Sequence, residues 1–568
     1  MSKRSISILL GLISVMAFAY IAGHYRLLPV YHLRTALEFI EEKIEGEEKH
    51  FPRPTESVDF MNSHLTRLLV KKIPLQNYDG SGGGLSESGN IMFISSNKGG
   101  LSVIDMNSYN RLSVSIDKLP MNYDKLVEAG QTERNSFREW WFRVNGIFSE
   151  QINESDFILY LSHNYYDDEK DCISHNVSTI NLTIQDDNVI QKDGWVTLFS
   201  AEPCFDPEPE GFVSAVPYSG HISGGAIQLY DEDHLIISVG DYNHHGLGQM
   251  PNYAQDPNNP YGKFLLLNKQ TGEWSVYAMG TRNPSGLFND NSGTVWSVEN
   301  GPEGGDELNI ITESQNYGWP EVSTGIWYTP GYTFSDTVLT GRHSGYQTPV
   351  FSWLPSIAPS SIIRLEGNRF SLWQGDLLVG AMRGQAIHRL RLNSDNDVIY
   401  DERIEFGHRV RDIIELQKGY VAILTDDSYL IILDDGGLSK EEPDQFVADR
   451  ILELEKFDRL ISKESQINVN VSPSMVFEQK CATCHLLSKK SVIGPHLSGL
   501  LGREVGSATD YTYSEVLSRD QRVWDEDLLR TFLVDPQSEF SGNRMNKIEL
   551  SDSEVNKLIR FFKSRETN

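Results

Sequence analysis

Short β-strand signals between residues 50 and 434 constrain the fold of this 568-residue chain more than any other feature. Each candidate strand is a short run of apolar and β-branched residues bounded by turns rich in Gly, Asn and Asp. The candidates are Asn90–Ser95, Phe157–Ser162, Leu235–Val239, Lys263–Leu267, Thr294–Val298, Asp376–Val379, Ile387–Leu392 and Tyr420–Thr425. No clean sequence repeat is evident, but so many strands predict a closed all-β architecture, and a propeller protects strand edges at this size.

The string Cys481-Ala482-Thr483-Cys484-His485 has the Cys-x-x-Cys-His form of a site for covalent haem attachment. The two thiols can form thioethers along one porphyrin edge, and the adjacent histidine then reaches the iron. A structural zinc site is the alternative, and it would need a second pair of ligands. No cysteine follows Cys484, and the one later histidine is His496. The motif therefore predicts a c-type haem and electron transfer.

The residues after this motif follow an order that suits a haem domain. Gly494-Pro495 comes first, at loop spacing, and Trp524 then opens an amphipathic stretch. The segment 542–545 ends in the thioether of Met545, and apolar residues at helical spacing predict a last helix from Ser551 to about Ser564.

This order resembles class I cytochrome c of the mitochondrial type over about residues 471–568, which implies a small all-α domain. The resemblance implies thioethers at Cys481 and Cys484 and axial iron ligands at His485 and Met545. It also gives the Pro495 carbonyl the role of orienting the His485 ring. Ligation by histidine and methionine raises the reduction potential of a haem.

The N-terminal residues predict export. Lys3 and Arg4 precede an apolar run from about Ile6 to Ala22, which is the pattern of a secretion signal or of an uncleaved membrane anchor. We therefore treat residues 1–24 as targeting. Both interpretations place the body of the chain outside the cytoplasm, in the periplasm or a similar compartment. The net charge of −29 argues against nucleic acid as a partner.

The chain has four cysteines, of which the haem motif takes two. The other two are Cys172 and Cys204, each just beyond a strand-like segment. In an exported protein this predicts a disulfide between them, and two buried, unpaired cysteines are the alternative.

Four polar strings in the β-rich region offer chemistry that folding alone does not require. They are His221-Ile222-Ser223-Gly224-Gly225, 281–287, 299–309 followed by 316–320, and Arg409-Val410-Arg411-Asp412. Arginines supply forked donors for carboxylates, and exposed carbonyls are hard oxygen ligands for Ca²⁺. Singly, each string is also what turns and solvated strand faces produce.

In this order the strings resemble the soluble quinoprotein glucose/aldose sugar dehydrogenase family, over roughly residues 60–434. The resemblance implies a six-bladed β-propeller that binds pyrroloquinoline quinone (PQQ) and Ca²⁺. It implies that His221 is the general base and that Asp241 orients it. The residues implied for PQQ are Arg282, Asn283, Asn300, Arg383, Arg409 and Arg411. The carbonyls of Gly301 and Pro302 would bind the PQQ-bridging calcium, and Glu307 with the Tyr317 carbonyl a second, structural calcium.

Joined in one chain, these parts predict a quinohaemoprotein dehydrogenase. It would oxidise an aldose sugar or an alcohol at PQQ and calcium and pass electrons one at a time to its own haem. An external acceptor, a cytochrome or an oxidase, would then take them. The alternative is an electron-transfer cytochrome c whose propeller is a PQQ-free module for a ligand or partner. The expected domains are a propeller over 50–434, a linker with one short helix over 435–470, and the cytochrome over 471–568.

Overall fold

The structure is a computed structural model in which the placement of some segments is not described. It describes residues 58–75, 78, 80–133, 138–206, 218–246, 251–326, 343–437, 445–461, 477, 481, 485, 487, 494–545, 550 and 552–564. The expected targeting segment 1–24 and Cys484 lie outside these residues. Within them, no helix combines the length and the apolar character needed to cross a membrane.

The first compact unit combines residues up to Pro74 with Ile222–Thr425 and Tyr429–Asp458, and it holds four antiparallel sheets. One sheet has β12 (Gly224–Leu229), β13 (His234–Val239), β14 (Lys263–Asn268) and β15 (Trp274–Met279). The next has β16 (Pro284–Asn289), β17 (Val295–Glu299), β18 (Asp306–Ile311) and β19 (Phe351–Trp353). A third has β20 (Pro359–Arg364), β21 (Leu377–Ala381), β22 (Ala386–Leu392) and β23 (Val398–Glu405).

The fourth sheet joins the two ends of the strand region. Its order is β1 (Asp59–Asn62), β2 (Arg67–Pro74), β26 (Tyr429–Asp435), β25 (Val421–Thr425) and β24 (Val410–Glu415). Strand β2 pairs with β26 over a register that runs from Leu68 opposite Asp435 to Pro74 opposite Tyr429. Residues far apart in the sequence therefore complete one sheet.

Consecutive sheets of this unit pack face to face through apolar cores. Trp296 and Leu308 pack with Leu377 and Val379 between the second and third sheets, and all four side chains are fully buried. Similar cores lie between the first and second sheets and between the third and fourth. The first strands β12, β16, β20 and β24 neighbour one another in that order. This is a sheet-rich, propeller-like fold. Every candidate strand predicted from the sequence coincides with an observed strand, apart from a one-residue difference at the start of β4, β17, β21 and β25.

Residues Leu75–His221 belong to the second unit and hold two further meanders of strands. The first meander has β3 (Gly84–Ser88), β4 (Ile91–Ser95), β5 (Leu101–Asp105) and β6 (Asn110–Ser115). The second has β7 (Val144–Gln151), β8 (Asp156–Asp167), β9 (Cys172–Gln185), β10 (Asn188–Gln191) and β11 (Val196–Ser200). Strand β10 pairs parallel to β6 and antiparallel to β9, and so links the two meanders.

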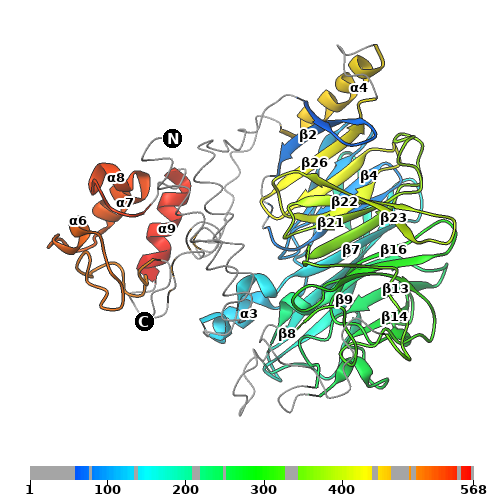
Figure 1. Cartoon of the computed structure of the whole chain (residues 1–568), viewed down its shortest axis with the longest axis horizontal. Helices are drawn as coiled ribbons and strands as arrows, with labels where there is room; N and C mark the ends of the chain where they lie inside the picture. Colours follow the sequence, from blue (N-terminus) through cyan, green and yellow to red (C-terminus); the bar gives the residue numbers. More distant parts are fainter. Residues whose placement is uncertain are drawn as a thin grey trace, which may run out of the picture. The chain divides into compact units, whose positions relative to one another are not determined.

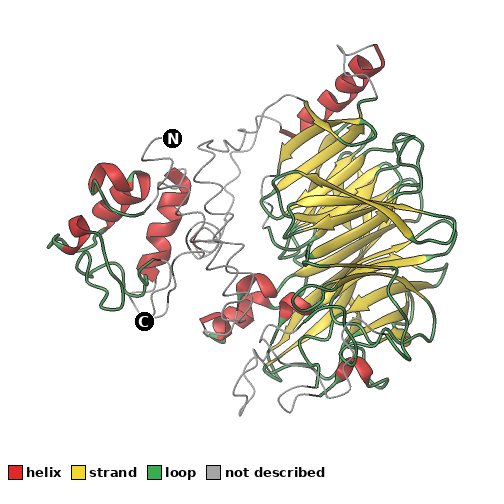
Figure 2. Ribbon diagram, viewed as in Figure 1, coloured by secondary structure: helices red, strands yellow, loops and turns green. Residues whose placement is uncertain are grey.

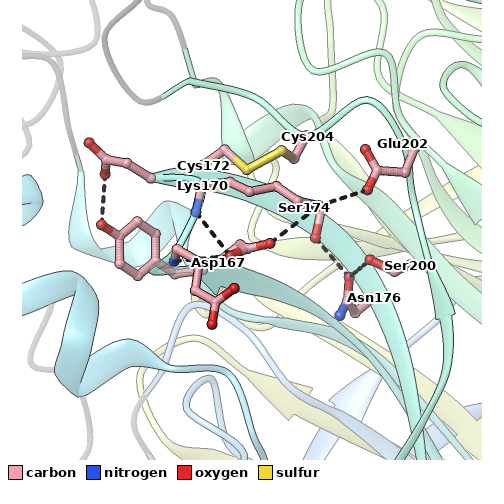
Figure 3. The surroundings of a disulfide bond; sticks show 11 residues. Asp167, Lys170, Cys172, Ser174, Asn176, Ser200, Glu202 and Cys204 are labelled. Carbon is pink, nitrogen blue, oxygen red and sulfur yellow. Dashed lines mark hydrogen bonds and ion pairs between the residues drawn. A yellow bond between two sulfur atoms is a disulfide. The ribbon is translucent and has the colours of Figure 1, made fainter.

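The predicted disulfide between Cys172 and Cys204 is present, which confirms that expectation. It joins the first residue of β9 to the segment after β11, and Ile173 and Phe205 form a backbone bridge beside it. Figure 3 shows Lys170 near this bond, with Asp167 at 3.4 Å and Glu202 at 3.3 Å. The disulfide therefore fastens the chain shortly before the segment that leads to His221.

Helices gather in the C-terminal part of the second unit, whereas strands dominate residues 59–435 (Figure 2). The helices are α6 (Glu515–Ser518), α7 (Glu526–Val534), α8 (Pro536–Glu539) and α9 (Asp552–Ser564). One apolar cluster joins α7 to α9 and includes Trp524, Phe532, Leu558 and Phe562. Asp525 caps α7 by accepting the N–H of Leu528 at 2.8 Å. Both helices lie where the apolar spacing of the sequence predicts them.

A short helix, α4 (Gln445–Glu455), follows the last strand and is fastened to the first unit, close to β2 and β26 in Figure 1. Its anchor is the fully buried carboxylate of Asp434, which receives Arg369 at 2.6 Å and also Arg450 of the helix. Glu453 accepts from Arg369 at 2.7 Å and from the Tyr420 hydroxyl at 2.9 Å. Part of the expected linker is thus attached to the sheets by buried charge pairs.

We expect the disulfide to stabilise the fold measurably. Its cysteines are 32 residues apart, and closing a loop of that size contributes roughly 3–4 kcal/mol to the free energy of unfolding. The double variant Cys172→Ser/Cys204→Ser should therefore unfold at lower urea concentration than wild type, as followed by far-UV circular dichroism. A reductant should lower the wild-type midpoint to the same value and leave the variant unchanged. Equal midpoints for oxidised wild type and the variant would contradict this.

Candidate active site and haem-ligand residues

The predicted site residues of the first unit lie on one set of loops. In an antiparallel sheet, the connections that follow second and fourth strands emerge at the same end. Asp241 follows β13, Arg282 and Asn283 precede β16, and the segment 300–305 joins β17 to β18. Arg383 joins β21 to β22, and Arg409 directly precedes β24. The antiparallel order therefore explains how residues from four sheets gather at one end of the unit.

Hydrogen bonds from backbone and side-chain groups connect several of these residues to one another. The Asp241 N–H donates to the Arg282 carbonyl at 2.8 Å, and the Asn300 N–H donates to the Asn283 carbonyl at 3.1 Å. The Arg282 guanidinium donates to the carbonyls of Asn300 at 3.0 Å and Gly301 at 2.8 Å. It also lies 5.4 Å from the Trp319 ring, a cation–π distance. Arg282 is thus the side chain around which the site is arranged.

The turn that presents the Gly301 carbonyl is built by a buried carboxylate. Asp306 is fully buried and accepts the Gly301 N–H at 3.0 Å and the N–H groups of Ile357 and Ala358 at 2.7 and 2.9 Å. A Cβ on Gly301 would lie 2.4 Å from the carbonyl oxygens of Gly304 and Gly305. The turn therefore requires glycine, and its carbonyls are held in place before any ligand binds.

A cavity lies directly beside this turn. Its lining consists of Arg282, Glu299, Asn300, Gly301, Gly305, Glu307, Tyr317, Trp319, Val322 and Ser323. Among the described residues, the predicted ligands Pro302, Arg383, Arg409 and Arg411 are not part of this lining. Arg383 and Arg409 are exposed and Arg411 is half-buried.

Glu299 and Glu307 face each other across the β17–β18 pairing, and both are almost completely buried. Burial and the neighbouring Glu307 carboxylate raise the pKa of Glu299 well above its usual range. The Glu299 carboxylate accepts the Arg282 N–H at 2.8 Å. In the part of the chain that the structure describes, no three His, Cys, Asp or Glu side chains gather around one metal position. The donors for a cation here are carboxylates together with backbone carbonyls, which is a hard oxygen set that fits Ca²⁺.

Asp241 has its own set of partners in the first unit. Its fully buried carboxylate accepts from the Trp319 indole at 2.7 Å and from the Asn243 N–H at 2.7 Å. Burial raises the pKa of Asp241 to about 6, although the charge of Arg282 opposes that shift. Whether Asp241 also orients His221 stays a prediction.

Lys263 is a buried cation that the sequence analysis did not single out. Its ammonium donates to the carbonyls of Tyr253 at 2.7 Å, Ala254 at 3.1 Å and Tyr261 at 2.8 Å. Burial lowers the pKa of Lys263 to about 7. The side chain fixes the loop that follows Asp241. An alternating strand pattern at β14 gave no sign of this role, because Lys263 occupies an inward position that apolar residues usually take.

His221 lies in the second unit, in the short helix η3 (Gly220–Ile222), and is half-buried. Its ring lies 4.7 Å from the Trp141 ring, with 32° between their planes, and 6.2 Å from the Trp140 ring. The ring of the predicted base is therefore held by aromatic contacts.

The haem-motif residues that the structure describes are consistent with iron ligation. The His485 N–H donates to the Cys481 carbonyl at 3.0 Å, so one helical turn joins them. His485 Nδ1 lies 2.7 Å from the Pro495 carbonyl, which assigns the proton to Nδ1 and leaves Nε2 with its lone pair. Burial lowers the pKa of His485 and favours the neutral ring, the form that can bind iron. A Cβ on Gly494 would lie 2.4 Å from this ring.

Met545 lies on a loop held by two side chains that the sequence analysis left without a role. Asn543 accepts the Met545 N–H at 2.7 Å, and its amide donates to the carbonyls of Pro536 and Phe540 at 2.6 and 2.8 Å. Gln537 donates to the Met545 carbonyl at 3.2 Å. Met545 itself packs against the apolar cluster of α7 and α9. These bonds fix the backbone from which the thioether projects.

With the geometry in place, comparison with known proteins identifies the sheet-rich part. Residues 156–433 match the family model described as Glucose / Sorbosone dehydrogenase. This segment is a glucose/sorbosone dehydrogenase domain. It contains every candidate residue of the first unit and also His221.

Individual relatives divide between the two parts of the chain. Aldose sugar dehydrogenase YliI of Escherichia coli is 33% identical over 227 residues, which are 37% of this chain and 58% of that protein. Quinoprotein glucose dehydrogenase B of Acinetobacter calcoaceticus is 24% identical over 41% of this chain and 64% of its own length. The C-terminal part is similar to cytochrome c-550 of Bradyrhizobium diazoefficiens, 34% identical over 14% of this chain and 62% of that protein.

The matches cover less than two thirds of each of these relatives. Among solved structures, a glucose dehydrogenase aligns with a TM-score of 0.50 and 24% identity, over 65% of this chain and all of that chain. This likeness supports the propeller-like fold of the dehydrogenase domain.

We predict that Met545→Ala removes the methionine–iron band of the haem spectrum and lowers the reduction potential, since a thioether ligand raises it. Leu497→Ala is the matched control, because Leu497 packs as a partly buried residue against the same apolar cluster. The control should lower stability and keep the band. A wild-type spectrum and potential in Met545→Ala would show that the ligand is a different residue.

We also predict that calcium stabilises the dehydrogenase domain more at pH 8 than at pH 5. The pKa of Glu299 is higher in the folded than in the unfolded state, so in chelator its contribution is present at low pH and is lost as pH rises. A cation offsets that loss, and binding to the folded state raises the melting temperature. Glu307→Gln should reduce this rise at pH 8, whereas Glu303→Gln, on the loop just before β18, should keep it. An equal rise at both pH values would contradict the account.

Proposed function

We propose that this chain is a quinohaemoprotein dehydrogenase, an oxidoreductase that acts on the CH–OH group of an aldose sugar or an alcohol. The observation that carries the proposal is the presence in one chain of a glucose/sorbosone dehydrogenase domain and a Cys-x-x-Cys-His motif whose histidine bonds to Pro495. A tethered haem experiences a high effective concentration of its electron donor. The chain's own haem would therefore accept the electrons before an external acceptor takes them.

The proposed architecture is a six-bladed propeller over about residues 50–434 and an all-α class I cytochrome c domain over about 471–568. Two observations support it: the first unit has four sheets and the second has two meanders, which is the number that six blades would need, and a solved glucose dehydrogenase aligns over its whole length. The proposed haem attachment uses Cys481 and Cys484, with His485 and Met545 as axial ligands. A disulfide and covalent haem both favour a location outside the cytoplasm, in the periplasm.

The residues present fit PQQ and Ca²⁺. Arg282, Arg383, Arg409 and Arg411 offer forked cations for the carboxylates of PQQ, and Asn283 and Asn300 offer amides. The carbonyls of Gly301 and Pro302 would hold the calcium that bridges to PQQ. Glu307 and the Tyr317 carbonyl would hold the second calcium, and the raised pKa of Glu299 nearby supports a need for positive charge there.

PQQ, when bound, supplies the two-electron oxidant, calcium polarises it, and haem c supplies the one-electron acceptor. The protein's own part is proton transfer and positioning. His221 would take the proton of the substrate hydroxyl as a general base. Asp241 would favour the charged form of that ring. Arg282 would hold the cofactor against the turn that Asp306 builds.

The decisive experiment uses the full chain, reconstituted with PQQ and Ca²⁺, and follows the haem absorption after a panel of aldoses and alcohols is added. Haem reduction by any member supports the proposal. If the protein binds no PQQ, the chain is instead an electron-transfer cytochrome c whose propeller binds a ligand or partner.

Two kinds of variant separate the proposed roles. His221→Ala should still bind PQQ and still accept electrons into the haem from a chemical reductant. It should lose substrate-driven haem reduction by roughly 10²–10⁴-fold, the usual contribution of a general base. Arg409→Ala should instead weaken PQQ binding, because it removes a charge-assisted contact. Wild-type turnover by PQQ-loaded His221→Ala would rule out its role as the base.

A further inference from the structure

Strand β2 carries a buried lysine at a position where an apolar residue is usual. The Lys71 side chain is completely buried, and its partner is Asp458 of η5 (Lys456–Ile461), the short helix that follows α4. Asp434 of β26 is also completely buried, and it pairs with Arg450 of α4. The register of β2 with β26 places Lys71 and Asp434 on the same face of the sheet. This face therefore holds two buried charges of opposite sign, and each is paired with a residue of α4 or η5.

Apolar and aromatic contacts reinforce these charge pairs. Val447, Leu454 and Phe457 of the two helices are completely buried or nearly so. The Phe457 ring meets the Tyr420 ring almost at right angles, with 5.6 Å between their centres. The Arg369 guanidinium lies 4.0 Å from the centre of the same tyrosine ring. The segment 445–458, which we call the strap, is therefore packed as a part of the first unit.

Removing the strap would take away a partner from each buried charge. A buried ion is unfavourable unless it is paired, and a pair that loses one member is strongly destabilised. Lys71 directly follows three buried apolar residues of β2, so the strand itself offers no counter-charge there. The sheet completed by β2 and β26 therefore favours a strap that stays docked.

The strap also determines where the connection to the haem motif begins. Cys481 comes about 20 positions after Asp458 but about 45 positions after Asp435, the last residue of β26, and each residue adds at most about 3.5 Å to the reach of a chain. Docking of the strap therefore shortens by about half the greatest distance that can separate Cys481 from its anchor on the sheet.

We propose that the strap is a positioning element for electron transfer. Held by Lys71 and Asp434, it keeps the connection between the haem motif and the dehydrogenase domain short. The effective concentration of a tethered partner falls roughly as the −3/2 power of the connection length, so release of the strap should lower it about 3-fold. This inference rests on the proposed function, and it assigns the rate of intramolecular electron transfer partly to residues outside the active site.

The first experiment follows the strap itself, by amide hydrogen exchange and mass spectrometry of the full chain. The amides of 445–458 should be protected as strongly as those of β25, because strap and sheet should open together. The strap-release variant Arg450→Ala/Asp458→Ala should lose this protection by at least about 10-fold. Arg364→Ala is the matched control, since it removes an arginine 2.9 Å from the buried Asp290 of the same unit. Weak protection of the strap in wild type would overturn the proposal.

The second experiment measures haem reduction by stopped flow in the chain loaded with PQQ and Ca²⁺. The strap-release variant should reduce its haem about 3-fold more slowly, with an unchanged KM and unchanged turnover when a soluble dye replaces the haem as acceptor. An insertion of about 25 Gly and Ser residues after Ile461 lengthens the connection and leaves the strap intact, so it should give the same loss. Equal losses in the haem and dye assays would overturn the proposal, because damage to the active site would then be the cause.

The outcomes separate this inference from the proposed function. A protected strap without haem reduction by any substrate in wild type would support the docking of the strap and overturn the proposed function. Haem reduction at the wild-type rate in both the strap-release and the insertion variant would overturn the positioning role alone.

Discussion

The pairing of β2 with β26 is the constraint on which the first unit depends. Without β2, the sheet of β24–β26 would have an open edge next to a fully apolar core. The pairing joins residues about 360 positions apart, from Leu68 opposite Asp435, so this sheet forms only when both ends of the strand region are present. Strand β26 also carries Asp434, next to its last residue, and the buried Asp434 carboxylate fastens α4 through Arg369 and Arg450. Strand β26 therefore fixes the position of α4, from which the chain continues to the haem motif.

A second level of organisation comes from charges that the fold buries at one end of its sheets. Asp306 is satisfied by three backbone N–H groups and builds the turn at Gly301. The buried carboxyl groups of Glu299 and Glu307 face each other, and the backbone N–H of Arg282 donates to Glu299. A scaffold that keeps this arrangement is suited to a cation and to an anionic ligand. This links the packing of the sheets to the chemistry proposed for the domain.

Much of the fold could be predicted from the sequence because the local signals agree with burial. The segments at β4, β13, β14 and β25 are apolar runs between turns, and the helix at α9 repeats its apolar residues at helical spacing. The parallel pairing of β10 with β6 could not be predicted, since register between distant strands leaves no local signal. The attachment of α4 was also missed, because Asp434 before Asp435-Gly436 is the composition of an ordinary turn.

The candidate site could likewise be predicted from the sequence only in part. Gly301, Glu307 and Arg282 stand in strings whose order could be compared with a known family. Glu299 has the appearance of a strand end, and Trp140 and Trp141 that of core aromatics. Their importance depends on burial and on ring contacts with His221, which only the three-dimensional structure supplies. The role of Asn543 was not predicted from the sequence. Its side chain hydrogen-bonds backbone groups whose positions depend on the fold, and such bonds leave no sequence motif.

The central claim is that one chain oxidises a sugar and delivers the electrons to its own haem. Stopped-flow absorption of the PQQ- and Ca²⁺-loaded protein, mixed with excess D-glucose at a series of protein concentrations, tests it most directly. The account predicts haem reduction with a first-order rate constant that stays the same on tenfold dilution, because the transfer is intramolecular. A rate constant that falls in proportion to protein concentration, or no haem reduction at any concentration, would contradict it.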